Sequence, residues 1–546
     1  MGKLGDIRGQ LTDTAGAIRC LHREGLIDVR DPGRFVDLAK GNKTVGPPAT
    51  ILKHNAHDVP DAPGFTDEHG TLTWRDLDEQ ANALANTLLT AGLQPGDTVG
   101  LMARDSRAVP LALAGAGRAG LRLALMNTGT GRAQFTEVAA REKLDALLYD
   151  EEFAEVTADL PADLPRILTW HEPDALVPDG VLTLDEAVAS GSRVPPPVPE
   201  KWGGMVILTS GTTGLPKGAN RAKFSPFASV LLLDRIGFPR DGSMVIVSPL
   251  FHSTGFALWS VSTALHNETV VMRRFDAEAT LAALAAHRSA GLVAVPTMLH
   301  RMIELGPEII GKYDLSALTT VVVAGSSLSP TLCERFQDAF GEVLYNLYGS
   351  TEVGVVAIAT PAELRARPGT IGRPPTTSHL ALFDDDGRRV SSPNVKARLF
   401  ARTLAPFQGY TDGRTKAEIG GYMSTGDMAY VDEDGLWFIA GRDDDMIVSG
   451  GENLYPLEVE NHLATHPTVA DVAVIGVDDD EYGTRLRAFI VAAEGAEPDA
   501  DELRAYVKAH LARYKVPRDV VIVDDLPRNP TGKLVRRLLP TGPLDD

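Results

Sequence analysis

The sequence predicts an α/β fold with largely parallel sheets, and three kinds of segment support this prediction. After Thr73, apolar side chains recur at the spacing of a helix with one face on a core, at Leu77, Ala81, Leu84, Ala85 and Leu88. Short apolar runs at 98–102 and 147–149 are typical of strands and flank a second expected helix at 109–119. Because strands that alternate with helices usually lie parallel in one sheet, the alternation gives the fold class.

The same alternation continues through the middle of the chain. Further short apolar runs, typical of buried strands, occur at 207–208, 244–247, 269–272, 291–295 and 320–324. The prolines between 195 and 199 predict a stiff connector, which we place on the surface and not at a domain boundary.

The pattern changes after Gly441. The acidic cluster at 443–445 is followed by Ser449, Gly450 and Gly451, where the backbone can turn freely. The chain then restarts with a small pattern of its own, with helices expected at 456–463 and 500–511 and strands at 472–477, 486–493 and 520–523. We therefore place a domain boundary close to Asp444.

Composition and charge narrow the class of protein. The chain has 546 residues, of which 44% are hydrophobic and 23% charged, as in globular enzymes and binding proteins. Its net charge of −20 argues against a nucleic-acid partner, which needs a basic surface. Two distant cysteines support neither a disulfide framework nor a thiolate metal site, and a reducing cytoplasm fits best.

The N-terminal region lacks an apolar run long enough for a signal peptide, and no stretch of about 18 apolar residues follows. We expect neither secretion nor membrane spanning. Residues 18–27 predict a short amphipathic helix with mixed charges. Packing of this helix on the main body is the preferred interpretation, and peripheral contact with a membrane surface stays open.

The first segment that indicates a ligand-binding site is 207–218. There an apolar strand is followed by hydroxyl-bearing residues, glycines and Lys217. Glycines let backbone N–H groups approach an anion, hydroxyls donate further hydrogen bonds, and a lysine neutralises charge. The segment differs from a Walker loop because its lysine follows a proline. We interpret it as a phosphate-binding loop, with a solvated turn as the alternative.

Two further clusters fit the rest of a nucleotide. In 347–352, Tyr348 beside a glycine suits stacking on a flat ring, and Glu352 suits Mg²⁺ between phosphate oxygens. In 424–427, Asp427 suits the vicinal hydroxyls of a ribose, with Arg442 in support. Taken singly, the first cluster is equally explained by a strand-end turn with a surface glutamate. For the second cluster alone, an Asx turn with a surface ion pair would be the favoured interpretation.

A fourth cluster, 527–534, presents Lys533 on a loop shaped by proline and glycine. Such a lysine can carry its charge into a site if its domain moves, although most lysines near a chain end are simply solvated. Together the four clusters resemble, in order, the motifs of the adenylate-forming superfamily of acyl-CoA synthetases, luciferases and peptide-synthetase adenylation domains. The resemblance covers residues from about 71 to 539 and is strongest to bacterial fatty-acyl-CoA ligases.

The resemblance implies a fold and a domain organisation. We expect a large N-terminal domain of αβ-layered sheets with a barrel-like subdomain, at 1–441, and a small mobile α+β C-terminal domain at 447–546. Residues 442–446 would be the hinge, with Asp444 as the position about which the small domain turns.

The resemblance also implies the roles of the nucleotide-binding residues. The loop that would hold the β- and γ-phosphates of ATP consists of Thr209, Ser210, Gly211, Thr212, Thr213, Gly214 and Lys217. Glu352 would bind Mg²⁺, and Thr351 would contact the α-phosphate. Tyr348 would stack on adenine with help from Gly325, Ser326 and Ser327, where the sequence departs from the usual glycine-rich pattern. Asp427 and Arg442 would contact the ribose.

The resemblance implies a two-step reaction. Lys533 would bridge the carboxylate and the α-phosphate while acyl-AMP forms, where charge builds up in the transition state. Rotation of the small domain would then withdraw Lys533 and bring Ser449, Gly450 and Gly451 to a tunnel for the pantetheine arm of coenzyme A. His252, in the segment 249–255, would border the acyl pocket and this tunnel.

Coenzyme A is the expected acceptor because no carrier-protein segment follows Lys533 in this sequence. The stretches 231–233 and 256–258 contain no residue that would pair with a carboxylate, which favours a medium- to long-chain fatty acid. The alternatives are an aryl or short acid, transfer to a carrier protein, or a nucleotide-binding regulator without turnover. Light emission ranks low, and a homodimer stays open.

Overall fold

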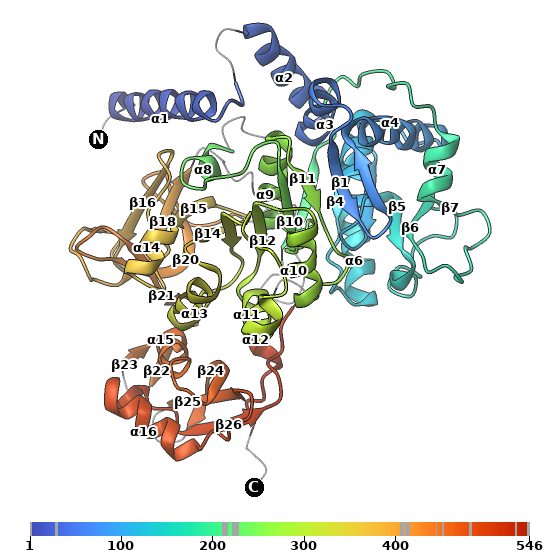
Figure 1. Cartoon of the computed structure of the whole chain (residues 1–546). Helices are drawn as coiled ribbons and strands as arrows, with labels where there is room; N and C mark the ends of the chain where they lie inside the picture. Colours follow the sequence, from blue (N-terminus) through green and yellow to red (C-terminus); the bar gives the residue numbers. More distant parts are fainter. Residues whose placement is uncertain are drawn as a thin grey trace.

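The computed structural model describes residues 3–27, 31–209, 217–220, 229–403, 409, 415–443, 445–449, 452–479, 483–529 and 532–542. In Figure 1 a large N-terminal domain with helices and sheets in layers lies above a small C-terminal domain, coloured orange to red. The mixed α/β architecture agrees with the predicted fold class.

The first sheet lies at the centre of the large domain. Its described strands, in spatial order, are β15 (Gly354–Ala359), β14 (Leu344–Ser350), β13 (Thr320–Val323), β12 (Gly291–Ala294), β10 (Ser243–Ile246), β11 (Glu268–Val270), β1 (Pro63–Asp67) and β2 (Gly70–Thr73). The strands from β14 to β1 are parallel, and β15 and β2 add antiparallel edges. Runs such as Thr320–Val323 are buried at every position, as expected for a sheet covered on both faces.

The second sheet has the order β7 (Leu182–Thr183), β6 (Arg166–Trp170), β5 (Leu144–Asp150), β3 (Thr98–Met102), β4 (Arg122–Leu125), β8 (Met205–Thr209) and β9 (Lys217–Asn220). It is parallel except for the final β8–β9 pair. Both sheets therefore confirm the expectation of largely parallel strands, which leaves loops with functional groups at their carboxyl ends.

Helices cover the faces of these sheets. In the large domain they are α1 (Lys3–Arg23), α2 (Pro32–Thr44), α3 (Pro47–Asp58), α4 (Trp74–Thr90), α5 (Ala108–Arg118), α6 (Arg132–Glu142), α7 (Leu184–Ser190), α8 (Val230–Leu233), α9 (Ser253–Ala264), α10 (Ala277–Ala286), α11 (Pro296–Glu304), α12 (Gly306–Ile310), α13 (Pro330–Phe340) and α14 (Pro361–Ala366). The predicted helix after Thr73 is α4, which begins with a reciprocal capping box between Thr73 and Asp76.

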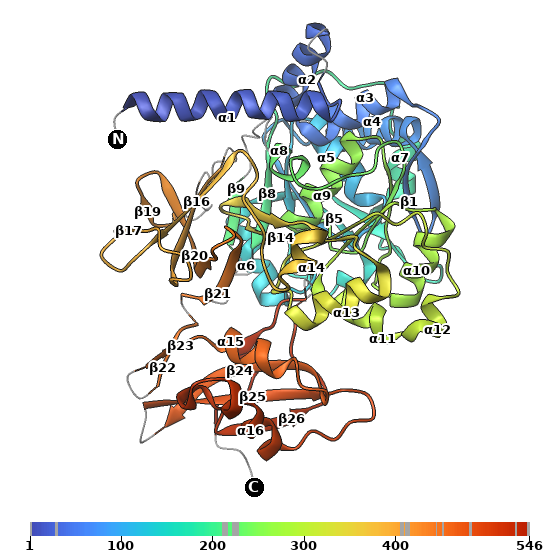
Figure 2. The same ribbon diagram turned by 60° about the vertical axis from the view of Figure 1, so that its left-hand side comes forward.

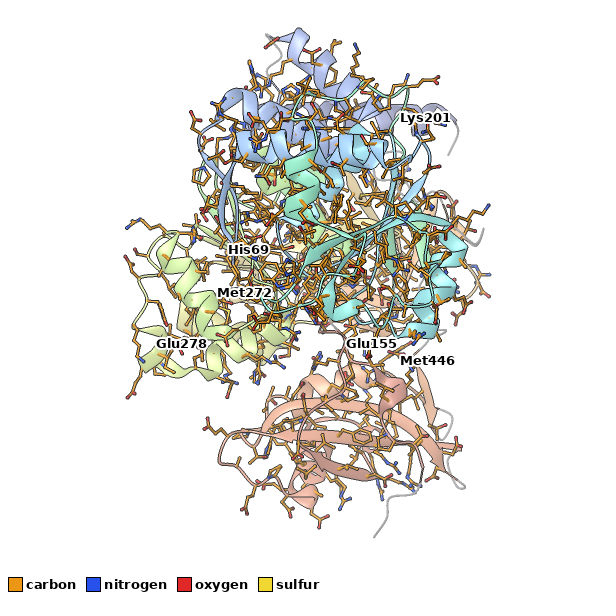
Figure 3. All side chains as sticks on the ribbon, turned by 90° about the vertical axis from the view of Figure 1, so that its right-hand side faces the viewer. His69, Glu155, Lys201, Met272, Glu278 and Met446 are labelled. Atoms are coloured by element: carbon orange, nitrogen blue, oxygen red, sulfur yellow. The ribbon has the colours of Figure 1, made fainter. Side chains whose placement is uncertain are left out.

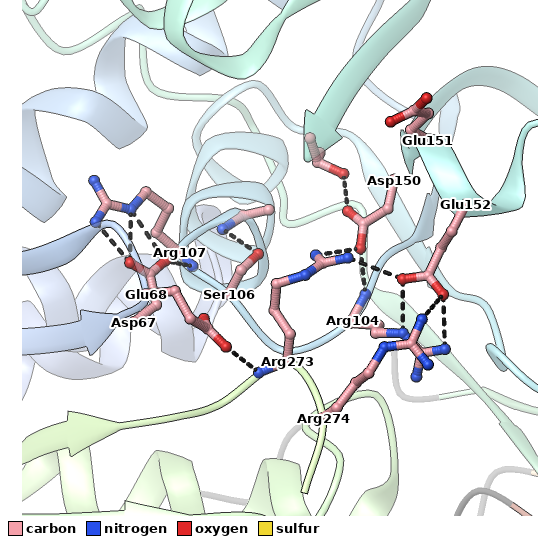
Figure 4. A network of polar contacts seen from close by, with 12 residues as sticks. Asp67, Glu68, Arg104, Ser106, Arg107, Asp150, Glu151, Glu152, Arg273 and Arg274 are labelled. Atoms are coloured by element: carbon pink, nitrogen blue, oxygen red, sulfur yellow. Dashed lines mark hydrogen bonds and ion pairs between the residues drawn. The ribbon is translucent and has the colours of Figure 1, made fainter. Parts of the chain in front are cut away.

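Buried ion pairs join the two parallel sheets (Figure 4). Arg273, just after β11 of the first sheet, donates to the fully buried Asp150 at the end of β5 in the second sheet, at 2.7 Å. Arg107, at the start of α5, contacts Asp67 at the end of β1 at 2.6 Å. Because removing one partner would leave a buried carboxylate uncompensated, these pairs hold the sheets in one relative position.

The third sheet is antiparallel and corresponds to the predicted barrel-like subdomain. Its strands are β17 (Arg389–Val390), β16 (Ser378–Phe383), β18 (Ala397–Thr403), β20 (Tyr422–Val431) and β19 (Glu418–Ile419), with β21 (Trp437–Arg442) paired to β20. The β20–β21 pair sets Asp427 opposite Arg442, which becomes important at the site.

The first helix differs from its prediction. The expected short helix at 18–27 is part of α1, which runs from Lys3 and already ends at Arg23, because Gly25 takes a left-handed backbone conformation with φ of 65°. Ala17, Cys20 and Leu21 are buried, and Asp13 forms an ion pair with His379 of β16 at 2.9 Å. Figure 2 shows α1 lying beside α8 and above the third sheet, so packing on the body is confirmed.

The C-terminal domain contains α15 (Pro456–Leu463), α16 (Ala500–His510), the hairpin β22 (Ile447–Ser449) and β23 (Glu452–Leu454), and the sheet β24 (Val469–Asp479), β25 (Gly483–Ala492) and β26 (Asp519–Val523). Figure 3 places Met446 where this domain joins the large one. Within the described ranges, every helix is too short or too polar to cross a membrane.

Candidate active site

One large cavity of about 1510 Å³ extends from the contact between the two domains into the large domain. At one end, which we call the polar end, it is lined by Tyr348, Asp427 and Lys533. At the other, which we call the helical end, it is lined by faces of α2, α3 and α9. Typical small-molecule sites enclose about 300–1,000 Å³, so this cavity has room for more than one ligand.

At the polar end, β14, β20 and β21 bring three predicted residues together. The Tyr348 hydroxyl donates a hydrogen bond to Asp427, and Arg442 lies 3.4 Å from the other oxygen of that carboxylate. Burial and the Asp427 charge raise the pKa of Tyr348 well above its usual range, so the hydroxyl keeps its proton. Burial raises the pKa of Asp427, and Arg442 opposes that effect. The arrangement fixes an aromatic ring beside a carboxylate with an oxygen toward the cavity.

The turn after β14 presents Thr351 and Glu352 to the same cavity. The Ser350 hydroxyl donates to Glu352 at 2.8 Å and accepts from the backbone N–H of that residue. Thr351 and Ser253, at the start of α9, share a hydrogen bond between their hydroxyls at 3.0 Å. This bond sets the first turn of α9 directly beside the polar end.

Lys533 reaches the polar end from the C-terminal domain. Its backbone N–H donates to the Asn529 side chain at 2.9 Å, and Gly532 closes the turn with a φ of 74°. A Cβ on Gly532 would lie 2.7 Å from Thr297 of the large domain, so only glycine allows this close approach. Lys533 is exposed to the open cavity, where partial desolvation lowers its pKa and Arg442 adds to the effect, while Asp427 and Glu352 act in the opposite direction.

The remaining predicted residues in the described part of the polar end lie around this group. Gly325, with a φ of 94°, and the adjacent Ser326 and Ser327 line the cavity after β13. Lys416, which sequence reasoning missed, lines the cavity beside Gly426 and interacts electrostatically with Asp427. A lone lysine in a loop before β20 carries no recognisable pattern, so only the fold could reveal it.

Part of the predicted site falls outside the described residues. Of the phosphate loop, Ser210, Gly211, Thr212, Thr213 and Gly214 lie outside, as do Asp444, Gly450 and Gly451. Thr209 and Lys217 are paired across β8 and β9, and Ser449 ends β22.

His252 lies at the first turn of α9, and its ring is 5.1 Å from that of Phe251. Its Nε2 is buried without a hydrogen-bond partner among the described residues. Burial, and to a smaller extent Lys533, lowers the pKa of His252 to about 4, so the imidazole is neutral at physiological pH. It is placed between the polar end and the start of the α9 face.

The loop that carries His252 is held by Asp105, a residue that sequence reasoning passed over. Asp105 is 7% exposed and accepts a hydrogen bond from the Leu250 backbone N–H at 2.9 Å. Burial raises the pKa of this carboxyl to about 7. The signal in the sequence was a single aspartate three residues beyond a buried strand, which is too common a pattern to single out.

The sequence profile described as AMP-binding enzyme matches residues 52–411, and the profile described as AMP-binding enzyme C-terminal domain matches 458–533. The chain belongs to the AMP-binding enzyme family. Two relatives illustrate its range. The fatty acid–[acyl-carrier-protein] ligase ScoC of Streptomyces coeruleorubidus is 31% identical, over 90% of this chain and 95% of that protein. A feruloyl-CoA synthase from an Amycolatopsis species is 32% identical, over 86% and 94%.

Solved structures of the family agree with the fold. The crystal structure of ATP-bound MatB from Rhodopseudomonas palustris superposes with a TM-score of 0.77 and 25% identity, over 90% of this chain and 98% of that one. This AMP-binding enzyme is thus an AMP-forming acid-thiol ligase, and the resemblance seen in the motifs is confirmed.

Proposed function

We propose that this AMP-binding enzyme activates a medium- to long-chain fatty acid as acyl-AMP and then transfers the acyl group to coenzyme A. The observation that carries the proposal is the continuity of the cavity from Lys533 and Thr351 along one face of α9. That face presents Ala257, Val261 and Ala264. The described lining between Ser253 and Ala264 contains no cation to pair with a second carboxylate, which fits a hydrocarbon chain.

The first half-reaction requires a carboxylate oxygen to attack the α-phosphorus of ATP while pyrophosphate leaves. In our assignment the Lys533 ammonium neutralises charge on the carboxylate and α-phosphate oxygens, where it builds up in the transition state. Tyr348 stacks on adenine, Asp427 and Arg442 hold the ribose, and Thr351 donates to the α-phosphate. The electrostatic interaction of Lys533 with Asp427 and Glu352 supports this assignment.

Mg²⁺ would be held by Glu352, and it would supply charge neutralisation for the phosphates when bound. The described residues offer no group of three or more His, Cys, Asp or Glu side chains for a metal. Glu352 would thus hold the ion outside any such cluster, in keeping with the one or two carboxylates that bind Mg²⁺ beside substrate phosphates. A carboxylate fixed by Ser350 at the cavity wall fits that role.

For the second half-reaction we propose that the small domain turns about Asp444, as predicted from the sequence, and that 1–441 and 447–546 move as separate bodies. Lys533 would leave the site, and Ser449, Gly450 and Gly451 would approach the pantetheine arm. His252 would then border the thiol path as a neutral imidazole, which its pKa of about 4 supports. We also propose that the enzyme carries out this reaction in the cytoplasm.

The two relatives named above act on different acids and different acceptors, so the acid and the thiol must be tested. We would measure acid-dependent pyrophosphate exchange with octanoate, dodecanoate, palmitate, benzoate and ferulate. Acid-dependent release of AMP would then be compared with coenzyme A and with a phosphopantetheinylated carrier protein. We expect fatty acids and coenzyme A to give the highest kcat/KM. Faster exchange with either aromatic acid, or transfer only to the carrier protein, would overturn the corresponding part of the proposal.

A further inference from the structure

The helical end of the cavity is built mostly from residues that precede the part of the chain matched by the family profile, which starts at residue 52. Three helices contribute one face each. The lining residues of α2 are Arg34, Phe35, Leu38, Ala39, Asn42 and Lys43, and those of α3 are Pro47, Ile51, His54 and Asn55. Both sets follow the spacing of a single helix face. Figure 1 shows α2 and α3 at the top of the large domain, on the side of α9.

Helix α9 connects the two ends and gives the cavity a length scale. It has 12 residues, from Ser253 to Ala264. At a rise of about 1.5 Å per residue, the face from Ser253 to Ala264 extends for roughly 16 Å. A fully extended chain advances about 3.5 Å per three bonds, so roughly 14 bonds fit along α9. Carbons of a longer acyl chain, beyond the end of α9, would lie against α2, α3 and the end of α1.

The chemistry of the helical end suits the far part of a hydrocarbon chain. Leu26, Ile27, Leu38 and Ile51 supply apolar surface from the loop after α1 and from the helices α2 and α3. Of the charged groups that α2 contributes, Arg34 forms an ion pair with Asp58, and Lys43 is exposed to solvent. Burial lowers the pKa of His54, with Arg34 adding to the effect, so this imidazole is held in its neutral form.

The helical end is also fixed in place. The backbone N–H of Trp202 donates to the carbonyl of Lys43 at 2.9 Å. Gly46, with a φ of 86°, lets the indole of Trp202 pack against the turn between α2 and α3. Figure 3 shows the neighbouring Lys201 beside the N-terminal helices. Contacts of this kind place the faces of α2 and α3 without requiring a ligand.

We propose that the end of α1, α2 and α3 form a binding subsite for the methyl-terminal part of long acyl chains, and that this subsite sets the preference for chains longer than about a dozen carbons. The proposal rests on the proposed function and goes beyond it. Acids that end within the α9 segment should not sense α2 or α3, whereas longer acids should depend on both. The N-terminal helices would thus determine specificity for chain length while Lys533 and its neighbours serve every acid.

Tryptophan substitutions test the subsite by filling it at a chosen depth. Leu38→Trp and Ile51→Trp should lower kcat/KM for palmitate and stearate by about tenfold or more, because each methylene that loses its apolar contact costs about 0.8 kcal/mol. Octanoate should stay within about twofold under the same change. Ala257→Trp, near the start of α9, should lower kcat/KM for octanoate as well. Val36→Trp is the matched control on α2, because Val36 is 60% exposed and does not line the cavity.

A second measurement identifies the contact directly in the unmodified enzyme. Two fatty acids with a terminal diazirine, one of eight carbons and one of sixteen, would each be photolysed with the enzyme in the presence of ATP. The labelled residues would then be identified by peptide mass spectrometry. The long reagent should label residues 34–55, and the short one residues 253–264. Labelling of 253–264 by both reagents, or an equal loss of octanoate and palmitate activity in Leu38→Trp, would overturn the subsite. Absence of exchange with every fatty acid in the unmodified enzyme would instead overturn the proposed function.

Discussion

The polar end of the cavity is assembled from strands of two sheets, the turn after β14 and a loop of the C-terminal domain, whereas the helical end is walled by continuous helix faces. Tyr348, Asp427 and Lys533 come from three separate regions of the chain and meet within one set of electrostatic contacts. At the helical end, α2, α3 and α9 each contribute several side chains, and apolar ones such as Phe35, Ile51 and Val261 occur on all three helices. Ligand binding at the polar end therefore depends on individual atoms, whereas binding at the helical end depends on the shape of a surface.

This difference has an energetic consequence. A charged or hydrogen-bonding group in a dry site leaves an unpaired partner when it is removed, so single substitutions at the polar end should have large effects. A hydrocarbon surface distributes its contribution over many contacts of small energy. Substitutions at the helical end should therefore give graded effects that depend on the ligand. The predictions below test this contrast in order of decreasing effect.

The largest effect is expected for Lys533→Ala. Removal of one preorganised cation at the reacting oxygens should lower the rate of acid-dependent pyrophosphate exchange by about 100- to 1,000-fold. Thioester formation from chemically prepared acyl-AMP should be spared, since the lysine is assigned to the first half-reaction alone. Both rates would be measured in the same preparation. Normal exchange in this variant would refute the assigned role, and an equal loss of both rates would point to damage of the whole site.

Asp427→Asn should have a smaller and more selective effect. The amide keeps the shape of the side chain but loses the charge that faces Arg442 at 3.4 Å and accepts from Tyr348. We expect the KM for ATP to rise by about tenfold, as for loss of one charged hydrogen bond, with the KM for the acid unchanged. Steady-state kinetics with ATP and the acid varied in turn gives the two KM values separately. A rise confined to the acid would show that Asp427 does not face the nucleotide.

Asp105→Asn changes a residue that lies between the two ends of the cavity. Its expected effect is on the stability of the protein and not on turnover. The folded-state pKa of about 7 lies above the ordinary value of 3.8, so the folded protein holds this proton more tightly than the unfolded chain. The stabilising contribution of this proton to the folded state is fully present below pH 3.8 and is lost as the pH rises to about 7. Above that pH the stability no longer changes through this group. At pH 8, Asp105→Asn should be more stable than the parent by up to roughly 4 kcal/mol. Near pH 4 the two proteins should have similar denaturation midpoints in urea. Equal stability at both values would contradict the raised pKa.

The same contrast explains what the sequence could predict. Tyr348, Glu352, Asp427 and Lys533 were predicted because the clusters that contain them resemble, together and in order, the motifs of one family, and the structure places all four around one cavity. The strands were found because both faces of a parallel sheet are buried, as in Thr320–Val323. Their pairing order across the chain, for example β10 between β12 and β11, follows from long-range contacts that no local pattern encodes.

The helical end was not predicted, for a physical reason. An apolar stripe such as Phe35, Leu38 and Ala39 on α2 has the same period whether it covers a core or a ligand. The length of α1 was underestimated because only the short stretch at 18–27 was counted, although Leu4, Ile7 and Leu11 already follow the spacing of a helix face in the sequence. A site for hydrocarbon can therefore be recognised only when the fold shows space behind the stripe.

The smallest effect is expected for Asp13→Asn, which removes the ion pair that ties α1 to the third sheet at His379. The pair is partly solvated, so its loss should cost less than about 1 kcal/mol of unfolding free energy, and the difference should shrink further at high salt. Since the buried side chains of α1 stay in place, chain-length preference should be retained, with the palmitate-to-octanoate ratio of kcat/KM unchanged within about twofold. Urea denaturation at low and high salt, together with that ratio, checks both expectations. A selective loss of palmitate activity in Asp13→Asn would mean that the position of α1 depends on this one contact, and the helical end would then resemble the polar end in its reliance on single atoms.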